Sequence, residues 1–145
     1  MVLITGATGN LGYGVIDQLL KIATTDKFVA LARNEEKASS LKIKRVEVRM
    51  GNFEEPDSLE TAFAGVEKLL LISTMEQNRF EQHKNVVDSA VKVGIKHIVY
   101  TGLGIRDIQT SHVKDLMIDH FQTEDLLGRT TAPINEFLKE VYQLK

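Results

Sequence analysis

The chain opens with Met1-Val2-Leu3-Ile4-Thr5-Gly6-Ala7-Thr8-Gly9-Asn10-Leu11-Gly12, and this stretch decides the fold. A short apolar run is followed directly by a glycine-rich segment and then by an amphipathic stretch over residues 15–21. Strand, glycine turn and helix in this order begin a nucleotide-binding βαβ unit. Glycines let the backbone approach a pyrophosphate, and the helix directs N–H groups and its positive dipole end at that anion. We expect a dinucleotide site here; a tight βα turn without a ligand is the alternative.

The rest of the chain repeats the alternation of strand and helix. The predicted strands cover residues 28–33, 46–50, 66–74 and 97–101, and the predicted helices cover residues 35–41, a segment opening at Pro56, 80–93 and 115–127. Such alternation with short connections predicts a parallel sheet with right-handed crossovers. The fold class is therefore α/β, a Rossmann-like doubly wound sheet of about five strands in the order 3-2-1-4-5. Residues 1–127 form the predicted NAD(P)-binding domain, and residues 128–145 a turn-like linker with a terminal helix.

Composition narrows the function classes. The chain has 145 residues, 43% of them hydrophobic, and a net charge of -2, so neither nucleic acid nor a membrane is an expected partner. The absence of cysteine removes disulfides and thiolate chemistry, and the four histidines lack a metal-ligand spacing. No basic signal segment precedes the first strand, and no apolar run reaches membrane-spanning length. We expect a cytoplasmic protein without a metal site.

Arg33 decides which dinucleotide the sequence favours. It ends the second predicted strand, 21 residues after Gly12, where the adenosine ribose normally lies. An acidic residue at that place accepts from the 2′-hydroxyl of NAD, whereas an arginine pairs with the 2′-phosphate of NADP. Asn34 stands beside it in place of a carboxylate, and Lys37 lies one helical turn further on. NADPH is favoured over NADH; a solvated loop arginine is the alternative.

Further candidates follow the other strands. Asn52 could hydrogen-bond the adenine edge and Phe53 could pack beside it, although a turn residue and a core phenylalanine explain the pair equally well. Ser73 and Thr74 end the fourth strand, where the ribose and nicotinamide would lie, and Thr101 ends the fifth in the same crevice. Small hydroxyl residues suit that place, and they also suit any strand terminus.

A catalytic acid is harder to find. None of the three tyrosines has a lysine four residues later, so carbonyl reduction by a Y-x-x-x-K pair is unsupported. Hydride transfer to an electron-poor acceptor such as a quinone needs less from the protein, because the cofactor supplies the chemistry. His120 and Glu124 share one face of a predicted helix, where a capped or ion-paired helix is favoured over a catalytic pair.

Several segments together resemble the NmrA-type atypical short-chain dehydrogenases, and among them the bacterial NAD(P)H:quinone oxidoreductases. They are residues 4–12, Ala32-Arg33-Asn34, residues 66–73, His83-Lys84-Asn85-Val86-Val87, residues 96–101 and His120-Phe121-Gln122-Thr123-Glu124. The resemblance implies NADPH binding and hydride transfer to a quinone, or nucleotide binding by a redox-sensing regulator without catalysis. It assigns pyrophosphate contacts to Gly6, Thr8, Gly9, Asn10, Leu11 and Gly12, and the 2′-phosphate to Arg33.

The chain departs from this family at three places. Asn52 stands where the family usually has aspartate, and Gly102 where it often has serine. Residues 127–133 already resemble the family's extreme C-terminal segment, so the substrate lobe expected after Glu124 is missing. We expect either a shortened polypeptide, joined near Leu126 to Gly128, or a sequence from which intervening residues were omitted. An uncovered sheet edge would then need the terminal helix or a second copy of the chain, as in a homodimer.

Overall fold

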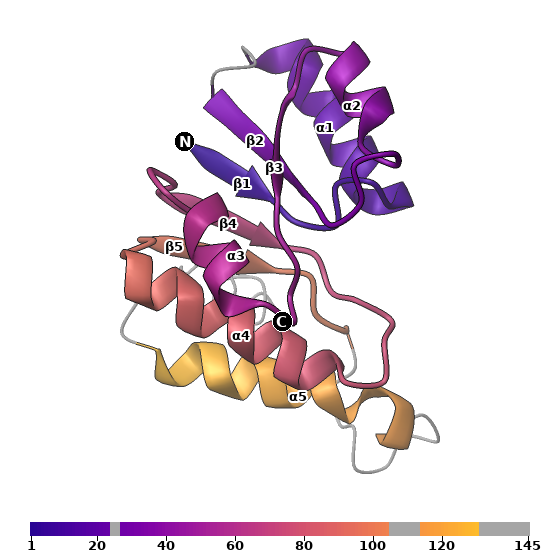
Figure 1. Cartoon of the computed structure of the whole chain (residues 1–145). Helices are drawn as coiled ribbons and strands as arrows, with labels where there is room; N and C mark the ends of the chain where they lie inside the picture. The colour runs from indigo at the N-terminus through magenta and orange to yellow at the C-terminus, as the bar shows by residue number, and fades with distance from the viewer. Residues whose placement is uncertain (24–26, 105–113, 131–145) are drawn as a thin grey trace.

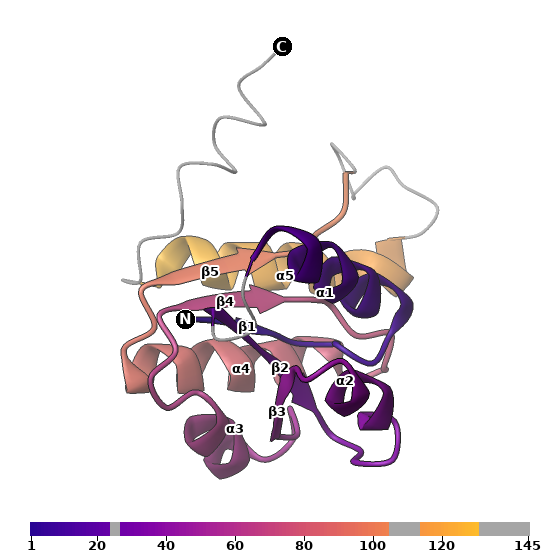
Figure 2. The ribbon, with the colours of Figure 1, turned by 90° about the horizontal axis from the view of Figure 1, so that it is seen from above.

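The protein forms one parallel sheet, seen in a computed structural model that describes residues 1–23, 27–104 and 114–130. Its strands are β1 (Val2–Ile4), β2 (Phe28–Ala32), β3 (Glu47–Met50), β4 (Lys68–Leu71) and β5 (His97–Tyr100). They lie in the order β3-β2-β1-β4-β5, which confirms the predicted topology (Figure 2). The order reverses between β1 and β4, whose registered pairs include Leu3 with Leu69. A ligand crevice is expected outside the carboxyl ends of these two strands.

Helices cover both faces of the sheet (Figure 1). Helices α1 and α2 lie on one side, and α3, α4 and α5 lie on the other. Their bounds are α1 (Asn10–Ile22), α2 (Ser39–Ile43), α3 (Pro56–Ala62), α4 (Arg79–Val93) and α5 (Lys114–Arg129). Pro56 occupies the first turn of α3, where its missing N–H costs nothing, and Gly94 ends α4 in the left-handed region at φ 82°. Short connections place β2 beside β1, β3 beside β2 and β5 beside β4, whereas the connection from β3 through α3 to β4 crosses to the other side of β1.

Two apolar clusters form the core, one on each face. Alternate strand residues divide between them: Leu3 packs on the side of α3, α4 and α5, and Ile4 packs on the side of α1 and α2. On β4, Leu69 and Leu71 join the first cluster, whereas Leu70 packs against the second. Strands buried on both faces read as continuous apolar runs, as the central strands do here.

The second helix begins later than predicted. The sequence predicted a helix over residues 35–41, but residues 35–38 form turns and α2 covers Ser39–Ile43. Asn34 Oδ1 accepts a hydrogen bond of 2.9 Å from Lys37 N. This local contact closes a turn around the side chain and competes with helical pairing.

The last elements also differ in length. The sequence predicted a strand over residues 66–74, but β4 covers Lys68–Leu71 only. Hydrogen bonds to side chains at the site replace strand pairing beyond Leu71. Helix α5 continues to Arg129, so Gly128 and Arg129 are helical rather than part of the predicted linker. The predicted terminal helix lies outside the described residues. Among the helices that are described, none combines the length and apolar character needed to span a bilayer.

Candidate dinucleotide cleft

A cleft of about 530 Å³ opens at the carboxyl ends of β1 and β4. It lies where the strand order reverses, as predicted for ligand binding in such sheets. Of the predicted site residues, all but Lys37 and Thr101 line it: Gly6, Thr8, Gly9, Asn10, Leu11, Gly12, Arg33, Asn52, Phe53, Ser73 and Thr74. The cofactor contacts of Lys37 and Thr101 stay predictions. The remaining wall is formed by Leu31, Ala32, Gly51, Ile72, Met75, Glu76 and Gln82.

The glycine turn is closed by its own backbone. Gly6 has φ 58°, a conformation that suits glycine, and its carbonyl accepts from Gly9 N at 2.9 Å. A Cβ on Gly12 would lie 2.2 Å from Gly6 O and 2.8 Å from Ala7 Cα. Both atoms belong to the backbone, so no side chain at position 12 could be accommodated without moving the turn. The glycines therefore bring strand and helix together as well as opening space for a ligand.

Helix α1 presents its N-terminus to the cleft. Gly9 is the N-cap and supplies no side-chain hydrogen bond, and the first turn contains no acidic residue. The first N–H groups of a helix have no partner within it, so those of Asn10, Leu11 and Gly12 are directed outward. Free N–H groups and the positive end of a helix dipole suit an anion, so a pyrophosphate contact here stays a prediction. Leu11 is 55% exposed and lines the cleft beside it.

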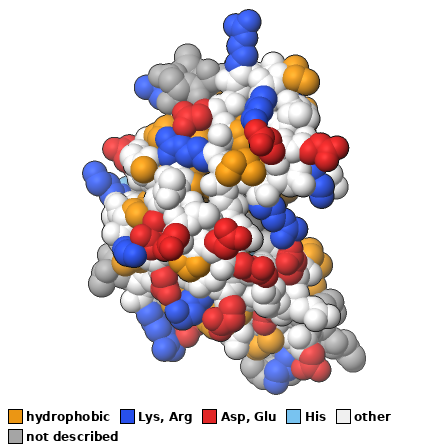
Figure 3. All heavy atoms as spheres, viewed as in Figure 1, with side chains coloured by type: hydrophobic (Ala, Val, Ile, Leu, Met, Phe, Trp, Pro, Cys, Tyr) orange, Lys and Arg blue, Asp and Glu red, His pale blue; other side chains and the backbone are white. Residues whose placement is uncertain are grey.

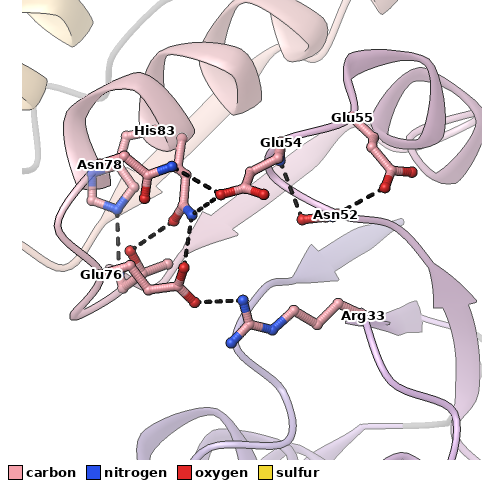
Figure 4. Close-up of polar contacts among 9 residues, drawn as sticks. Arg33, Asn52, Glu54, Glu55, Glu76, Asn78 and His83 are labelled. Carbon is pink, nitrogen blue, oxygen red and sulfur yellow. Dashed lines mark hydrogen bonds and ion pairs between the residues drawn. The ribbon is translucent and has the colours of Figure 1, made fainter.

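Arg33 lies across the cleft from the glycine turn, at the end of β2. Its guanidinium forms an ion pair with the Glu76 carboxylate, which comes from the loop between β4 and α4 (Figure 4). Lys37 is exposed and lies outside the cleft lining. Acidic side chains gather over α3 on the adjacent surface (Figure 3). Arg33 therefore faces carboxylates rather than a cluster of basic groups.

Asn52 and Phe53 line the cleft, and both also have structural roles. Asn52 Oδ1 accepts from Glu54 N at 3.2 Å, and its Nδ2 donates to Glu55 Oε1 at 3.2 Å. Phe53 packs against the larger apolar cluster, and its carbonyl accepts from Asn85 Nδ2 at 2.9 Å. The turn and core interpretations are therefore correct for this pair, while adenine contacts stay a prediction.

The exit of β4 is shaped by side-chain acceptors from three other elements. Ile72 N donates to Thr5 Oγ1 at 2.8 Å, and Ser73 N donates to Thr101 Oγ1 at 2.9 Å. Thr74 N donates to His83 Nε2 at 3.3 Å. These contacts replace strand pairing, which is why β4 ends at Leu71 although the apolar sequence continues. Thr101 acts on the cleft through Ser73, a role that its sequence position alone did not indicate.

The protonation of His83 follows from its contacts. Because Nε2 accepts from Thr74 N, the proton lies on Nδ1, which donates to Thr123 Oγ1 at 3.0 Å. Thr123 in turn donates to Asp119 O at 2.8 Å. Burial first, and then the charges of His120 and Arg79, lower the pKa of His83 to about 4. A neutral, fully buried histidine thus supports the wall of the cleft.

His120 and Glu124 do not form a pair. His120 is 3% exposed, and its Nδ1 lies 2.7 Å from Tyr100 Oη; burial raises the pKa of Tyr100 to about 12. Glu124 instead lies against Gly102, where a Cβ would come within 2.3 Å of its Oε1. Burial raises the pKa of Glu124, opposed by a hydrogen bond from the Leu103 backbone. These two residues therefore form neither a catalytic pair nor an ion pair with each other: His120 contacts Tyr100 of β5, and Glu124 packs against the segment that follows β5.

Three site residues were missed by sequence reasoning: Glu76, Gln82 and His83, the last noted only within a similar segment. One signal was available, since His83 shares the buried stripe of α4 with Val86, Val87 and Ala90. A polar residue on such a stripe needs a partner. In residues 1–23, 27–104 and 114–130, no group of three or more His, Asp or Glu residues is arranged to hold a metal ion.

A parallel sheet with a glycine turn at its switch point defines a Rossmann-like domain. A model of the NmrA-like family matches residues 1–126, and the chain belongs to this family. It is 41% identical over 129 residues to quinone oxidoreductase 2 of Escherichia coli, with 88% of this chain and 44% of that protein covered.

The chain is also similar to solved structures, and two of these were solved in complex with NADP(H) or NADPH. The triphenylmethane reductase of Citrobacter sp., complexed with NADP(H), has a TM-score of 0.85 and 42% identity, over 92% of this chain and 47% of that one. The NADPH-dependent quinone oxidoreductase of Escherichia coli, complexed with NADPH, has a TM-score of 0.85 and 39% identity, with the same coverage. The chain therefore spans about half the length of these relatives.

Proposed function

We propose that the cleft binds NADPH and that the protein is an oxidoreductase that passes hydride to a quinone-type acceptor. One observation carries the nucleotide assignment: a glycine turn at a helix N-terminus and an arginine face each other across one cleft. The first suits a pyrophosphate, and the second suits a phosphate at the other end of the same molecule. The acceptor class is supported by the similar quinone oxidoreductase.

In this proposal the turn formed by Gly6, Gly9 and Gly12 lets the pyrophosphate approach the backbone. Asn10 and Leu11 supply N–H groups at the start of α1, and Thr8 supplies one from the turn that precedes the N-cap.

Arg33 pairs with the 2′-phosphate of the adenosine in this proposal. Asn52 and Phe53 flank the base at the end of β3, and Lys37 adds positive charge at longer range.

Ser73 and Thr74 line the nicotinamide side in this proposal, and Thr101 fixes Ser73 through its backbone N–H. The bound cofactor supplies the hydride, and this wall holds the reacting rings in place and excludes water. The β4 exit is suited to this role because its backbone is already paired and needs no reordering on binding.

The alternative is a redox-sensing regulator that binds NADP(H) without catalysis. Tyr100 is compatible with both functions: its hydroxyl contacts His120 and it is not part of the cleft lining, but quinone reduction needs no tyrosine acid. Turnover of NADPH with a naphthoquinone separates the two functions. Binding without turnover above the uncatalysed rate would support the regulator.

Replacement of Arg33 by alanine tests the nucleotide assignment. NADPH affinity should fall by about ten- to a hundredfold and NADH affinity by less than about threefold, because only NADPH carries the 2′-phosphate. Lys37→Ala is the comparison variant: it removes a positive charge that lies outside the cleft lining and acts only at longer range, so NADPH affinity should fall by less than in Arg33→Ala. Fluorescence titration measures both cofactors. Equal losses for NADPH and NADH in Arg33→Ala would contradict the assignment.

A further inference from the structure

The Arg33–Glu76 ion pair spans the cleft. Arg33 follows β2 and Glu76 follows β4, so the pair joins segments on opposite sides of β1 (Figure 4). Both side chains also line the cleft. Any ligand group that pairs with Arg33 from within the cleft must therefore compete with a carboxylate that is already there.

Gln82 holds Glu76 in this position. Its side chain comes from α4, is 2% exposed, and donates from Nε2 to Glu76 Oε2 at 3.0 Å and to Glu54 Oε1 at 3.2 Å. Its Oε1 accepts from Thr74 Oγ1 at 3.1 Å, which fixes the orientation of the amide. Asn78 Nδ2 donates to the same oxygen of Glu54 at 2.8 Å. Glu76 is thus one of two carboxylates held by a buried amide.

Both carboxylates are charged at neutral pH. The hydrogen bond from Arg33, followed by that from Gln82, lowers the pKa of Glu76. Hydrogen bonds from Asn78 and Gln82 lower the pKa of Glu54. One guanidinium therefore lies near two negative charges, of which Glu76 lines the cleft and Glu54 lies behind it in the same network. A phosphate arriving there meets repulsion from both carboxylates as well as attraction to Arg33.

The ion pair is nevertheless open to displacement. The side chain of Arg33 is 65% exposed and that of Glu76 is 37% exposed. Pairs in contact with solvent are weak, because water and salt screen the charges. A phosphate with two charges and several acceptor oxygens is the stronger partner for a guanidinium.

We propose that Glu76 is a specificity-determining residue that competes with the 2′-phosphate of the nucleotide for Arg33, and that Gln82 positions it for this role. This inference rests on the proposed nucleotide site. The ion pair lowers the affinity for 2′-phosphorylated nucleotides. The difference between the affinities for NADPH and NADH is therefore smaller than it would be if Arg33 had no carboxylate partner.

The test uses 2′,5′-ADP and 5′-AMP as probes, with binding measured by calorimetry at low salt. Glu76→Gln keeps the shape of the side chain and removes its charge. It should tighten 2′,5′-ADP by about three- to tenfold and change 5′-AMP by less than about twofold. Glu54→Gln is the matched control, because it removes a charge from the same network without freeing Arg33; it should tighten 2′,5′-ADP by less than Glu76→Gln does.

A double variant tests whether the effect of Glu76 depends on Arg33. In an Arg33→Ala background, Glu76→Gln should change 2′,5′-ADP affinity by less than about twofold, because the competition no longer exists. Weaker binding in Glu76→Gln would overturn the inference and make Glu76 a ligand contact. Equal gains in Glu54→Gln and Glu76→Gln would overturn it in favour of general repulsion. A wild-type chain that binds neither probe would instead refute the proposed nucleotide site.

Discussion

The two walls of the cleft are built in different ways. The wall formed by residues 6–12 is shaped mainly by its backbone, through close contacts such as Gly12 against Gly6 O. The opposite wall, over residues 72–76, is held by side chains of Thr5, Gln82, His83 and Thr101. The first wall is encoded within a few consecutive residues. The second depends on partners up to 67 residues away.

This difference determines how each wall should respond to substitution. At Gly12 the backbone wall has no room for an added atom, because the neighbouring atoms belong to the backbone and cannot turn away. A wall held by hydrogen bonds should lose stability in smaller steps, one contact at a time, and should respond to pH where a histidine takes part.

The largest effect is expected in the backbone wall. Gly12→Ala should lower the free energy of unfolding by about 3 kcal/mol or more, because the new Cβ would overlap Gly6 O and Ala7 Cα. It should also abolish NADPH binding. Gly14→Ala is the control in the same helix: no atom lies within 4 Å of its Cβ position, and alanine there should stabilise by about 0.5–1 kcal/mol. Urea unfolding measures both; similar stabilities for the two variants would contradict the difference between these positions.

The second effect is the pH dependence of the hydrogen-bonded wall. The pKa of His83 is about 4 in the folded protein and about 6.5 when unfolded, so the unfolded chain binds the proton more readily. This histidine therefore adds stability above pH 6.5, and about 2–3 kcal/mol of it should be lost as the pH falls to 4.

His83→Gln tests this contribution. The variant should be less stable at pH 7, yet lose less of its remaining free energy of unfolding on acidification than the wild type does. His97→Gln, a histidine outside the network, is the comparison variant. Denaturant unfolding at several pH values between 4 and 7 measures the slopes. A wild-type slope in His83→Gln would show that another group causes the acid sensitivity.

The smallest effect concerns one hydroxyl. Thr101→Val removes the acceptor of Ser73 N and should cost about 1 kcal/mol of unfolding free energy. Thr101→Ser keeps the oxygen and should cost less than about half as much. Hydrogen exchange of the Ser73 amide provides a local measurement, with faster exchange in Thr101→Val than in Thr101→Ser. Equal exchange in the two variants would show that the hydroxyl does not hold this wall.

The sequence was sufficient to predict the sheet order and the position of the backbone wall. Both depend on local patterns: apolar runs, a glycine turn and alternating helices, which act over a few residues. Arg33 could be placed at the cleft because it ends β2, and the carboxyl ends of parallel strands meet at one edge.

The hydrogen-bonded wall could not be predicted in the same way. Which side chain accepts from Ser73 N, or pairs with Arg33, depends on how α4 and β5 are placed against β4. A pattern of residue types does not contain that geometry. The start of α2 was also mispredicted, because the Asn34 side chain accepts a hydrogen bond from Lys37 N and competes with helical pairing.

Thr5 has one further consequence. Its Oγ1 accepts from Ile72 N at 2.8 Å and donates to Ile72 O at 3.4 Å, while its own N–H donates to Leu70 O at 3.0 Å. A single residue thus joins β1 to β4 at the point where the two strands diverge. Motion that widens the cleft has to take place beyond this point, in the loops. Thr5 therefore keeps the two walls at a constant separation where they meet the sheet.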